Sequence, residues 1–346
     1  MRRLILILFI ILSVIYPVKA LEFLAPEVPA ESRRIMPNAT DSFEDGIREL
    51  LSNALNLVKP DVFDAWKTCI LLTGCTFLVG IFQIAGSKMT QLSHMIGALT
   101  IGSAVLMDSK AMIYLGADAV DTIADYGKLL LPVMTGALAA QGAPASSAAL
   151  YAGTAFFSAL LSDAISKLLI PGVTLFLVLA TAQCSFDEPI LKCLKDVIKN
   201  ITSWILKTTL SVFMAYIGIT GVVSGTTDAA ALKATKLAFS SFIPVVGGIL
   251  SDASEAVLVG VSLAKNAAGI YGMFALLSIL AEPFLRIGMQ YLMLKLTGFL
   301  CSVYASKQIS ELIGDYSSAM GLLLGMVASV CLLLLIGTVC FMKGLA

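Results

Sequence analysis

Charged residues are scarce in this chain. Asp, Glu, Lys and Arg make up 13% of its 346 residues, about half of the roughly 25% that is usual in soluble domains. Acids and bases number 23 each, so there is no surplus of positive charge to neutralise the phosphates of a nucleic acid. With 58% apolar residues, the composition excludes an ordinary soluble domain and predicts a polytopic membrane protein that contacts lipid and no nucleic acid.

Residue types that carry catalysis or bind metals are also few. The chain has one histidine, His94, and seven cysteines without a C-x-x-C pair, so the usual ligand set of a zinc site is missing. No H-E-x-x-H, G-x-S-x-G or G-x-x-x-x-G-K-[ST] motif occurs. Gly314-Asp315 lacks the preceding glycine of an intramembrane aspartyl protease, because Leu312 stands at that position. We therefore expect no enzyme, no cofactor and no metal site.

The first twenty residues have the pattern of a secretory signal peptide. Arg2 and Arg3 precede an uncharged stretch, and Val18-Lys19-Ala20 places small residues at the positions that a signal peptidase reads. An uncleaved first span is the alternative, although the apolar run is shorter than the ~20 residues of a full crossing. Either form predicts export of the residues that follow.

Residues 21–64 form the one sizeable polar region, which we expect to be a short extracytoplasmic segment. Ser42 followed by Asp45 fits a helix start. Apolar residues then recur at helical spacing and predict an amphipathic helix that lies on the membrane surface or on a partner: Phe43, Ile47, Leu50, Leu51, Leu55 and Val58.

Residues 65–346 read as a multi-pass membrane domain, and the fold class predicted is an all-α bundle. Seven spans would carry the chain from outside to a cytoplasmic C-terminus, although lysines and arginines divide evenly between the two sides and do not fix the orientation. The predicted spans are residues 66–86, 92–107, 165–183, 201–224, 268–281, 284–304 and 318–341.

Two further apolar segments, residues 129–161 and 239–263, are interrupted and predict helical hairpins that enter and leave the membrane on one side. Broken backbone at membrane depth requires cover from protein or water. An offset of 112 residues aligns Pro132 with Pro244, whereas a competing offset of 89 aligns Asp163 with Asp252, so an internal duplication stays open. Such repeats are typical of secondary transporters. The predicted helix breaks are Pro132, Gly136, Pro144, Pro244 and Gly248.

Charges inside or beside these spans are the candidate functional residues, because ionisable groups in a membrane tend to face a bundle interior or a water path. Asp163 and Lys167 are four residues apart in the acid-first order that pairs well on a helix, and Glu282 with Arg286 repeats that spacing. Interfacial or purely structural pairing is the alternative for each pair. The candidates are Asp163, Lys167, Asp252, Glu255, Lys265, Asn266, Glu282 and Arg286.

Four blocks of this sequence resemble the stage III sporulation protein AE family. They begin at Leu129, Ser158, Phe242 and Leu263, and the likeness is strongest between about residues 125 and 300. The resemblance implies a protein of the mother-cell membrane around the forespore of an endospore-forming bacterium. It also implies membership in a secretion-like channel complex, with a separate cytoplasmic ATPase and ring-forming single-span proteins as partners.

Three functions remain open on the sequence. The first is an integral-membrane channel or export-gate component of the sporulation apparatus, with the candidate charges lining a path. The second is a self-contained secondary transporter of a small solute, which the repeat and the midplane charges also allow. The third is a membrane scaffold in which every charge is structural.

Overall fold

The computed structural model describes residues 25–38, 43–85, 90–140, 144–186, 188–219 and 267–345. A 3-10 turn, η1 (Ser32–Arg34), precedes six long helical arms, and the part of the chain that is described contains no strand. The arms are α2 (Phe43–Ala85), α3 (Thr90–Ala140), α4 (Pro144–Ala164) continued through the π-helical segment η2 (Ile165–Leu169) into α5 (Ile170–Phe186), α6 (Pro189–Ile219), α9 (Ala267–Cys301) and α10 (Lys307–Leu345). The prediction of an all-α polytopic bundle is confirmed.

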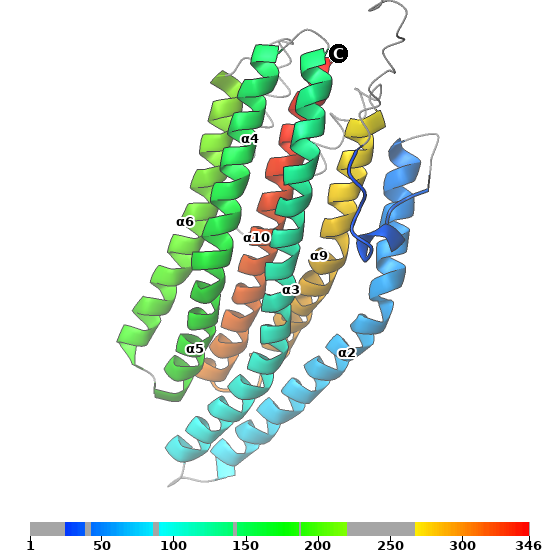
Figure 1. The fold of residues 1–346 in the computed structure, drawn as a ribbon. Coiled ribbons are helices and arrows are strands. Elements are labelled where there is room, and N and C mark those ends of the chain that lie inside the picture. The colour runs from blue at the N-terminus through cyan, green and yellow to red at the C-terminus, as the bar shows by residue number, and fades with distance from the viewer. Residues whose placement is uncertain are drawn as a thin grey trace, which may run out of the picture.

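The arms run alternately down and up the bundle (Figure 1). Helix α10 lies at the centre and packs against α3, α4, α5, α6 and α9. Every residue from Ala319 to Leu335 is buried. A helix that is apolar on all sides has no polar surface for contact with water, so it is stable only when other helices or lipid surround it. Here the neighbouring helices of the same chain surround it.

Six helical segments in the described residues are long and apolar enough to cross a membrane. The longest element, α3, has 51 residues, which at a rise of 1.5 Å per residue is about 75 Å. The hydrocarbon core of a bilayer is only ~30 Å thick. The arms are therefore much longer than a single crossing requires.

The predicted spans 268–281 and 284–304 are one helix, not two. Helix α9 runs through Pro283 without ending. Proline removes one backbone N–H donor, and membrane helices tolerate this loss when neighbouring helices pack against the site. Figure 1 places the start of α2 and the end of α10 at the same end of the bundle. Six helices of span length lie in the described residues, beside the about seven spans predicted for the whole chain.

The first predicted hairpin also differs from the structure. Helix α3 passes through Pro132 and Gly136, so these residues do not break the helix. Thr135 donates a hydrogen bond from Oγ1 to the Leu131 carbonyl at 2.7 Å, within the turn that contains the proline. The helix ends at Ala140 and the next begins at Pro144, where a missing N–H has no cost because first-turn donors lack helical partners. The two arms, α3 and the helix formed by α4, η2 and α5, continue in opposite directions along the bundle.

The amphipathic helix expected near residues 42–58 is the beginning of α2, which continues through Pro60 and across residue 65. Its apolar face packs on α9 and not on the membrane surface. Phe43 and Phe274 have ring centroids 4.8 Å apart, and Leu50 and Ala54 are buried in the same cluster. Two residues assigned to that face, Leu51 and Leu55, are instead half exposed.

Candidate functional site

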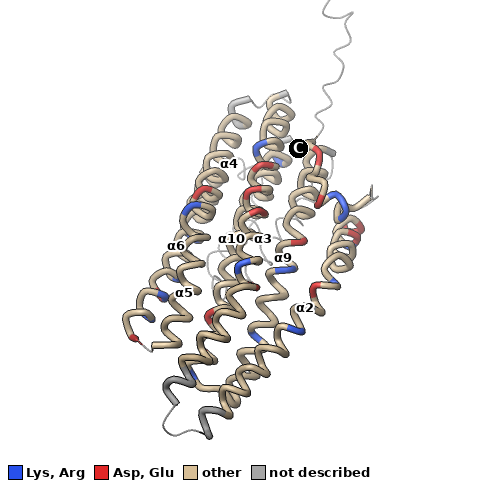
Figure 2. Tube along the Cα trace, turned by 60° about the horizontal axis from the view of Figure 1, so that its bottom comes forward, with Lys and Arg blue, Asp and Glu red and all other residues tan. Residues whose placement is uncertain are grey.

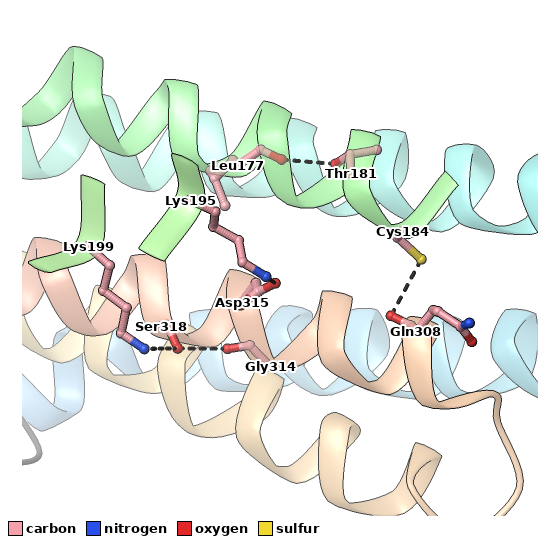
Figure 3. Close-up of polar contacts among 9 residues, drawn as sticks. All are labelled: Leu177, Thr181, Cys184, Lys195, Lys199, Gln308, Gly314, Asp315 and Ser318. Atoms are coloured by element: carbon pink, nitrogen blue, oxygen red, sulfur yellow. Dashed lines mark hydrogen bonds and ion pairs between the residues drawn. The ribbon is translucent and has the colours of Figure 1, made fainter. Parts of the chain in front are cut away.

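A buried ion pair joins α6 to α10 in the lower half of the bundle. The ammonium of Lys195 donates to the Oδ2 atom of Asp315 (Figure 3). The two residues are 120 positions apart in sequence. The Lys195 side chain is 6% exposed and that of Asp315 is 19% exposed. Both charges therefore lie largely inside the protein, and the attraction between them offsets the cost of removing each charge from water.

Burial makes this pair energetically important. Moving a charge out of water costs several kcal/mol, and only a close partner with good geometry offsets that cost. Lys195 reaches Asp315 from α6, which packs on α5, α10 and α4. The buried Phe213 of α6, for example, contacts Phe157 of α4. The pair thus fixes where α6 lies along α10, because a shift of one turn would separate the charges in a poorly hydrated interior.

Polar groups of α5, α6 and α10 surround the pair (Figure 3). Lys199 lies one turn after Lys195 and donates to Ser318 Oγ at 3.5 Å, and Ser318 donates to the Gly314 carbonyl at 2.9 Å. On the other side, the Cys184 thiol donates to the Gln308 carbonyl at 3.4 Å. A cavity of about 10 Å³ beside Asp315 and Cys184 has room for about one water molecule.

A second polar contact lies next to the pair and joins three helices. Tyr316 is fully buried, and its hydroxyl lies 2.9 Å from Thr181 Oγ1 on α5 and donates to the Gly102 carbonyl on α3 at 3.0 Å. A Cβ atom at Gly102 would lie 2.5 Å from Thr181 Cγ2, so only glycine allows α3 and α5 to approach this closely. Residues 315 and 316 of α10 therefore bind α6, α5 and α3 together.

The contacts of this cluster are made by charged and polar groups that hold neighbouring helices in position. A lysine and an aspartate can exchange a proton or change partners. No group of three or more His, Cys, Asp or Glu side chains that could hold a metal ion is found in the described ranges. The charge pair holds α6 against α10.

Asp163 and Lys167 form the predicted pair at 2.8 Å. They lie at the junction of α4 and η2, and their side chains are 67% and 74% exposed. Within the π-helical segment, Ser166 donates to Asp121 Oδ1 on α3 at 3.0 Å. π-helical turns are often found at functional sites. The pair lies on the outside of the described bundle.

Glu282 and Arg286 also pair as predicted, at 3.1 Å, and Arg286 has a second partner that the sequence did not indicate. Its Nε lies 2.9 Å from Asp61 Oδ2 of α2. This partly buried set joins α2 to α9. Among the ion pairs of the described residues, none connects it with Asp163 and Lys167, so the two predicted pairs are separate sites.

The remaining predicted residues lie outside the described residues. They are Asp252, Glu255, Lys265, Asn266, Pro244 and Gly248, together with the second predicted hairpin at 239–263.

Sequence reasoning missed Lys195 and Asp315 as a site. One signal was present, because the buried residues Thr202 and Leu206 continue at helical spacing from Lys195 and place the lysine on the packed stripe of α6. Its partner could not be found in the same way, since 120 residues separate the two. Only the fold brings them together.

Comparison with known proteins gives a consistent match. The family model described as stage III sporulation protein AE matches residues 38–344, which include every long helix described above. The stage III sporulation protein AE of Bacillus subtilis (strain 168) is 25% identical to this chain over 222 residues. That match covers 64% of this chain and 56% of the relative, so the chain matches only a little over half of the relative's length. No solved structure matches.

Proposed function

The chain belongs to the stage III sporulation protein AE family, and from that premise we propose that it is the polytopic membrane component of a channel complex between mother cell and forespore. Its family and its six span-length helices make it a multi-pass membrane protein of sporulation. We also propose that the protein lies in the mother-cell membrane around the forespore. The proposal also includes two kinds of partner, a cytoplasmic ATPase and ring-forming single-span proteins.

The observation that carries the proposal is the extent of the family match, which runs from residue 38 through α10. The architecture supports a role in assembly, because a central helix that is buried along its apolar length makes a rigid core. Helices that extend well beyond one bilayer thickness provide surface on which other proteins can pack. We propose no catalytic role for any residue.

Within this role the pair of Lys195 and Asp315 acts as a latch between α6 and α10. Helix α6 is bound to the core at one level by the pair, and it leads into residues 220–266. Release of the latch would free α6 to move relative to α10. The surface pair Asp163–Lys167 and the charges around Arg286, which join α2 to α9, either line a pathway or stabilise the structure.

Crosslinking followed by purification tests the proposal. The tagged protein is crosslinked mildly in membranes of sporulating cells, purified, and its companions are identified by mass spectrometry. We expect the ATPase and the ring-forming proteins in stoichiometric amounts. A variant with Lys195→Met and Asp315→Leu separates assembly from latch function, because it keeps the apolar packing and removes both charges. Recovery of the protein alone, as a monomer or dimer, would contradict the proposal.

A self-contained secondary transporter remains the alternative. It predicts that the purified protein alone moves a solute into vesicles. In the described residues the predicted charges form separate local pairs, and the cavity beside Asp315 holds about one water. These observations favour the component of a complex over the autonomous transporter.

A further inference from the structure

Helix α2 changes direction part-way along its length (Figure 1). Sharp bends in helices occur mostly at prolines, and α2 has a proline in its interior, Pro60. The proline ring has no N–H to donate and crowds the carbonyl of Asn56, one turn earlier, so the helix is weakened at this level. Helix α9 also contains an interior proline, Pro283. Each of the two helices therefore has one weak turn.

The two weak turns lie at the same level. Helices α2 and α9 pack side by side and run in the same direction, with contacts near their upper ends and again further down. Asp61 directly follows Pro60 on α2. Its Oδ2 atom lies 2.9 Å from Nε of Arg286, which is less than one turn after Pro283 on α9. Figure 2 shows charged residues of both signs where the two helices adjoin. An ion contact thus joins α2 to α9 where both helices are weakest.

The contact between Asp61 and Arg286 is an attraction between charges and not an aligned hydrogen bond. The two atoms are shielded from solvent, but neither has a hydrogen-bond partner among the described residues, because the Nε–H group does not point at the carboxylate oxygen. A hydrogen bond weakens steeply when its donor is misaligned, whereas the attraction between two charges depends on their separation. The contact therefore holds the helices close together and allows the angle between them to change.

Arg286 has a second carboxylate partner on its own helix. Its Nη2 atom lies 3.1 Å from Oε1 of Glu282, one turn earlier on α9. When Arg286 leaves Asp61, the guanidinium stays paired with Glu282, and the Asp61 side chain, which is 37% exposed, can be hydrated. Opening of a buried ion pair is expensive when it leaves a charge without compensation, which is the case for Lys195 and Asp315. The contact between α2 and α9 can open at a much lower cost.

The part of α2 that follows Pro60 is the part that such an opening would move. Helix α9 packs along the central helix α10, whereas α2 lies at the edge of the bundle and packs against α9 and α3 (Figure 1). Its outer face is exposed below the proline, as at Phe63 and Trp66. The polar contacts that join this part to α9 include the thiols of Cys69 and Cys301, which form only weak hydrogen bonds. A change of the bend would therefore displace α2 and leave α9 in place.

We propose that Arg286 is the clamp of a hinge in α2. Contact with Asp61 fixes the bend at Pro60, and pairing of Arg286 with Glu282 alone releases the part of α2 that follows the proline. The two states differ in whether the guanidinium contacts both carboxylates or only that of Glu282. The hinge is a property of the folded protein, and it does not depend on a role in a channel complex.

Hydrogen exchange of the full-length protein in detergent, measured by mass spectrometry, tests the hinge. Arg286→Gln should speed exchange of the amides of residues 57–64 about tenfold, because the clamp is lost. Glu282→Gln should slow exchange of the same amides about threefold, because the guanidinium then keeps Asp61 as its carboxylate partner. Asp125→Asn is the matched control, since it removes a carboxylate from an exposed ion pair on α3, and it should leave this exchange unchanged.

The direction of the Glu282→Gln effect separates a clamp from a merely structural group of charges. A structural group would lose protection when any of its members is removed, so faster exchange in Glu282→Gln would overturn the proposal. Because we expect this variant to be more protected, it still gives a result if Arg286→Gln fails to fold. Pro60→Ala restores the backbone donor, so Arg286→Gln should have little effect in its presence. Equal acceleration with and without Pro60, or no acceleration in Arg286→Gln, would also overturn the hinge.

Discussion

Replacing Lys195 by Met should strongly destabilise the bundle, because the carboxylate of Asp315 then stays in a mostly buried site without its counter-charge. Removal of one partner from a buried ion pair costs about 3–5 kcal/mol. Asp315→Leu should cost a similar amount through the buried ammonium. The double variant leaves no orphaned charge. Replacement of a buried pair by apolar residues is often neutral or stabilising by about 1–4 kcal/mol, so the double variant should be more stable than either single variant.

Thermal unfolding of the purified protein in detergent, followed by circular dichroism, measures these differences. A cost of about 3–5 kcal/mol should lower the unfolding temperature by roughly 5–15 °C in a protein of this size. Lys199→Met is the matched control, since Lys199 lies one turn away on the same helix and has only a 3.5 Å contact with Ser318 at the surface. Its loss should cost at most about 1 kcal/mol.

Two results would refute this reasoning. If Lys195→Met behaves like Lys199→Met, the pair is not an important part of the folded state. If the double variant loses as much stability as the two single variants together, the charges act independently and α6 is not fixed by their contact. The same variants then test function. A double variant that folds normally but fails in sporulation would indicate that the charges are needed for movement of α6.

Gly102→Ala should cost about 1–3 kcal/mol, because its new methyl group would overlap Thr181, whereas Gly74→Ala meets no atom within 4 Å and should be neutral or slightly stabilising in the same unfolding assay. Arg286→Gln should loosen the contact between α2 and α9 at a cost of about 1–2 kcal/mol, detected as faster hydrogen exchange in the first half of α2. Asp163→Asn should leave stability nearly unchanged because the pair is exposed. If Asp163 lines a functional path, this variant should still impair forespore development at normal protein level, and normal spores would contradict that role.

The sequence was sufficient for the class of fold and for the positions of most helices. Long apolar runs with few charges have no stable state in water other than burial or lipid contact, so their presence predicts membrane helices directly. The end of α3 at Ala140 and the start of α4 at Pro144 also have a local signal, because Gly142 and Pro144 in the sequence disfavour a continuous helix. Each of these patterns lies within one short stretch of sequence, so it can be recognised without knowledge of the fold.

The break expected at Pro132 was wrong, and so was the division of α9 into separate spans at 268–281 and 284–304. The physical reason lies outside the local sequence. A proline costs one hydrogen bond, but the surrounding residues of α3 and α9 pack along α10 over many turns. Leu130, Leu131 and Met134, next to the first proline, are almost fully buried. Packing of this extent outweighs a cost of about 3 kcal/mol. Whether a proline ends a helix thus depends on neighbours that only the fold provides.

The number of described arms follows from the second of these prolines, Pro283. Because α9 is one helix, the described arms number six, and α2 begins at the end of the bundle where α10 finishes. Helix α6 ends and α9 begins at that end of the bundle too. If each arm crosses the bilayer once, the residues before α2 and the residues after α10 share a compartment. Export of the first would then place the second outside the cytoplasm, opposite to the expectation from seven spans.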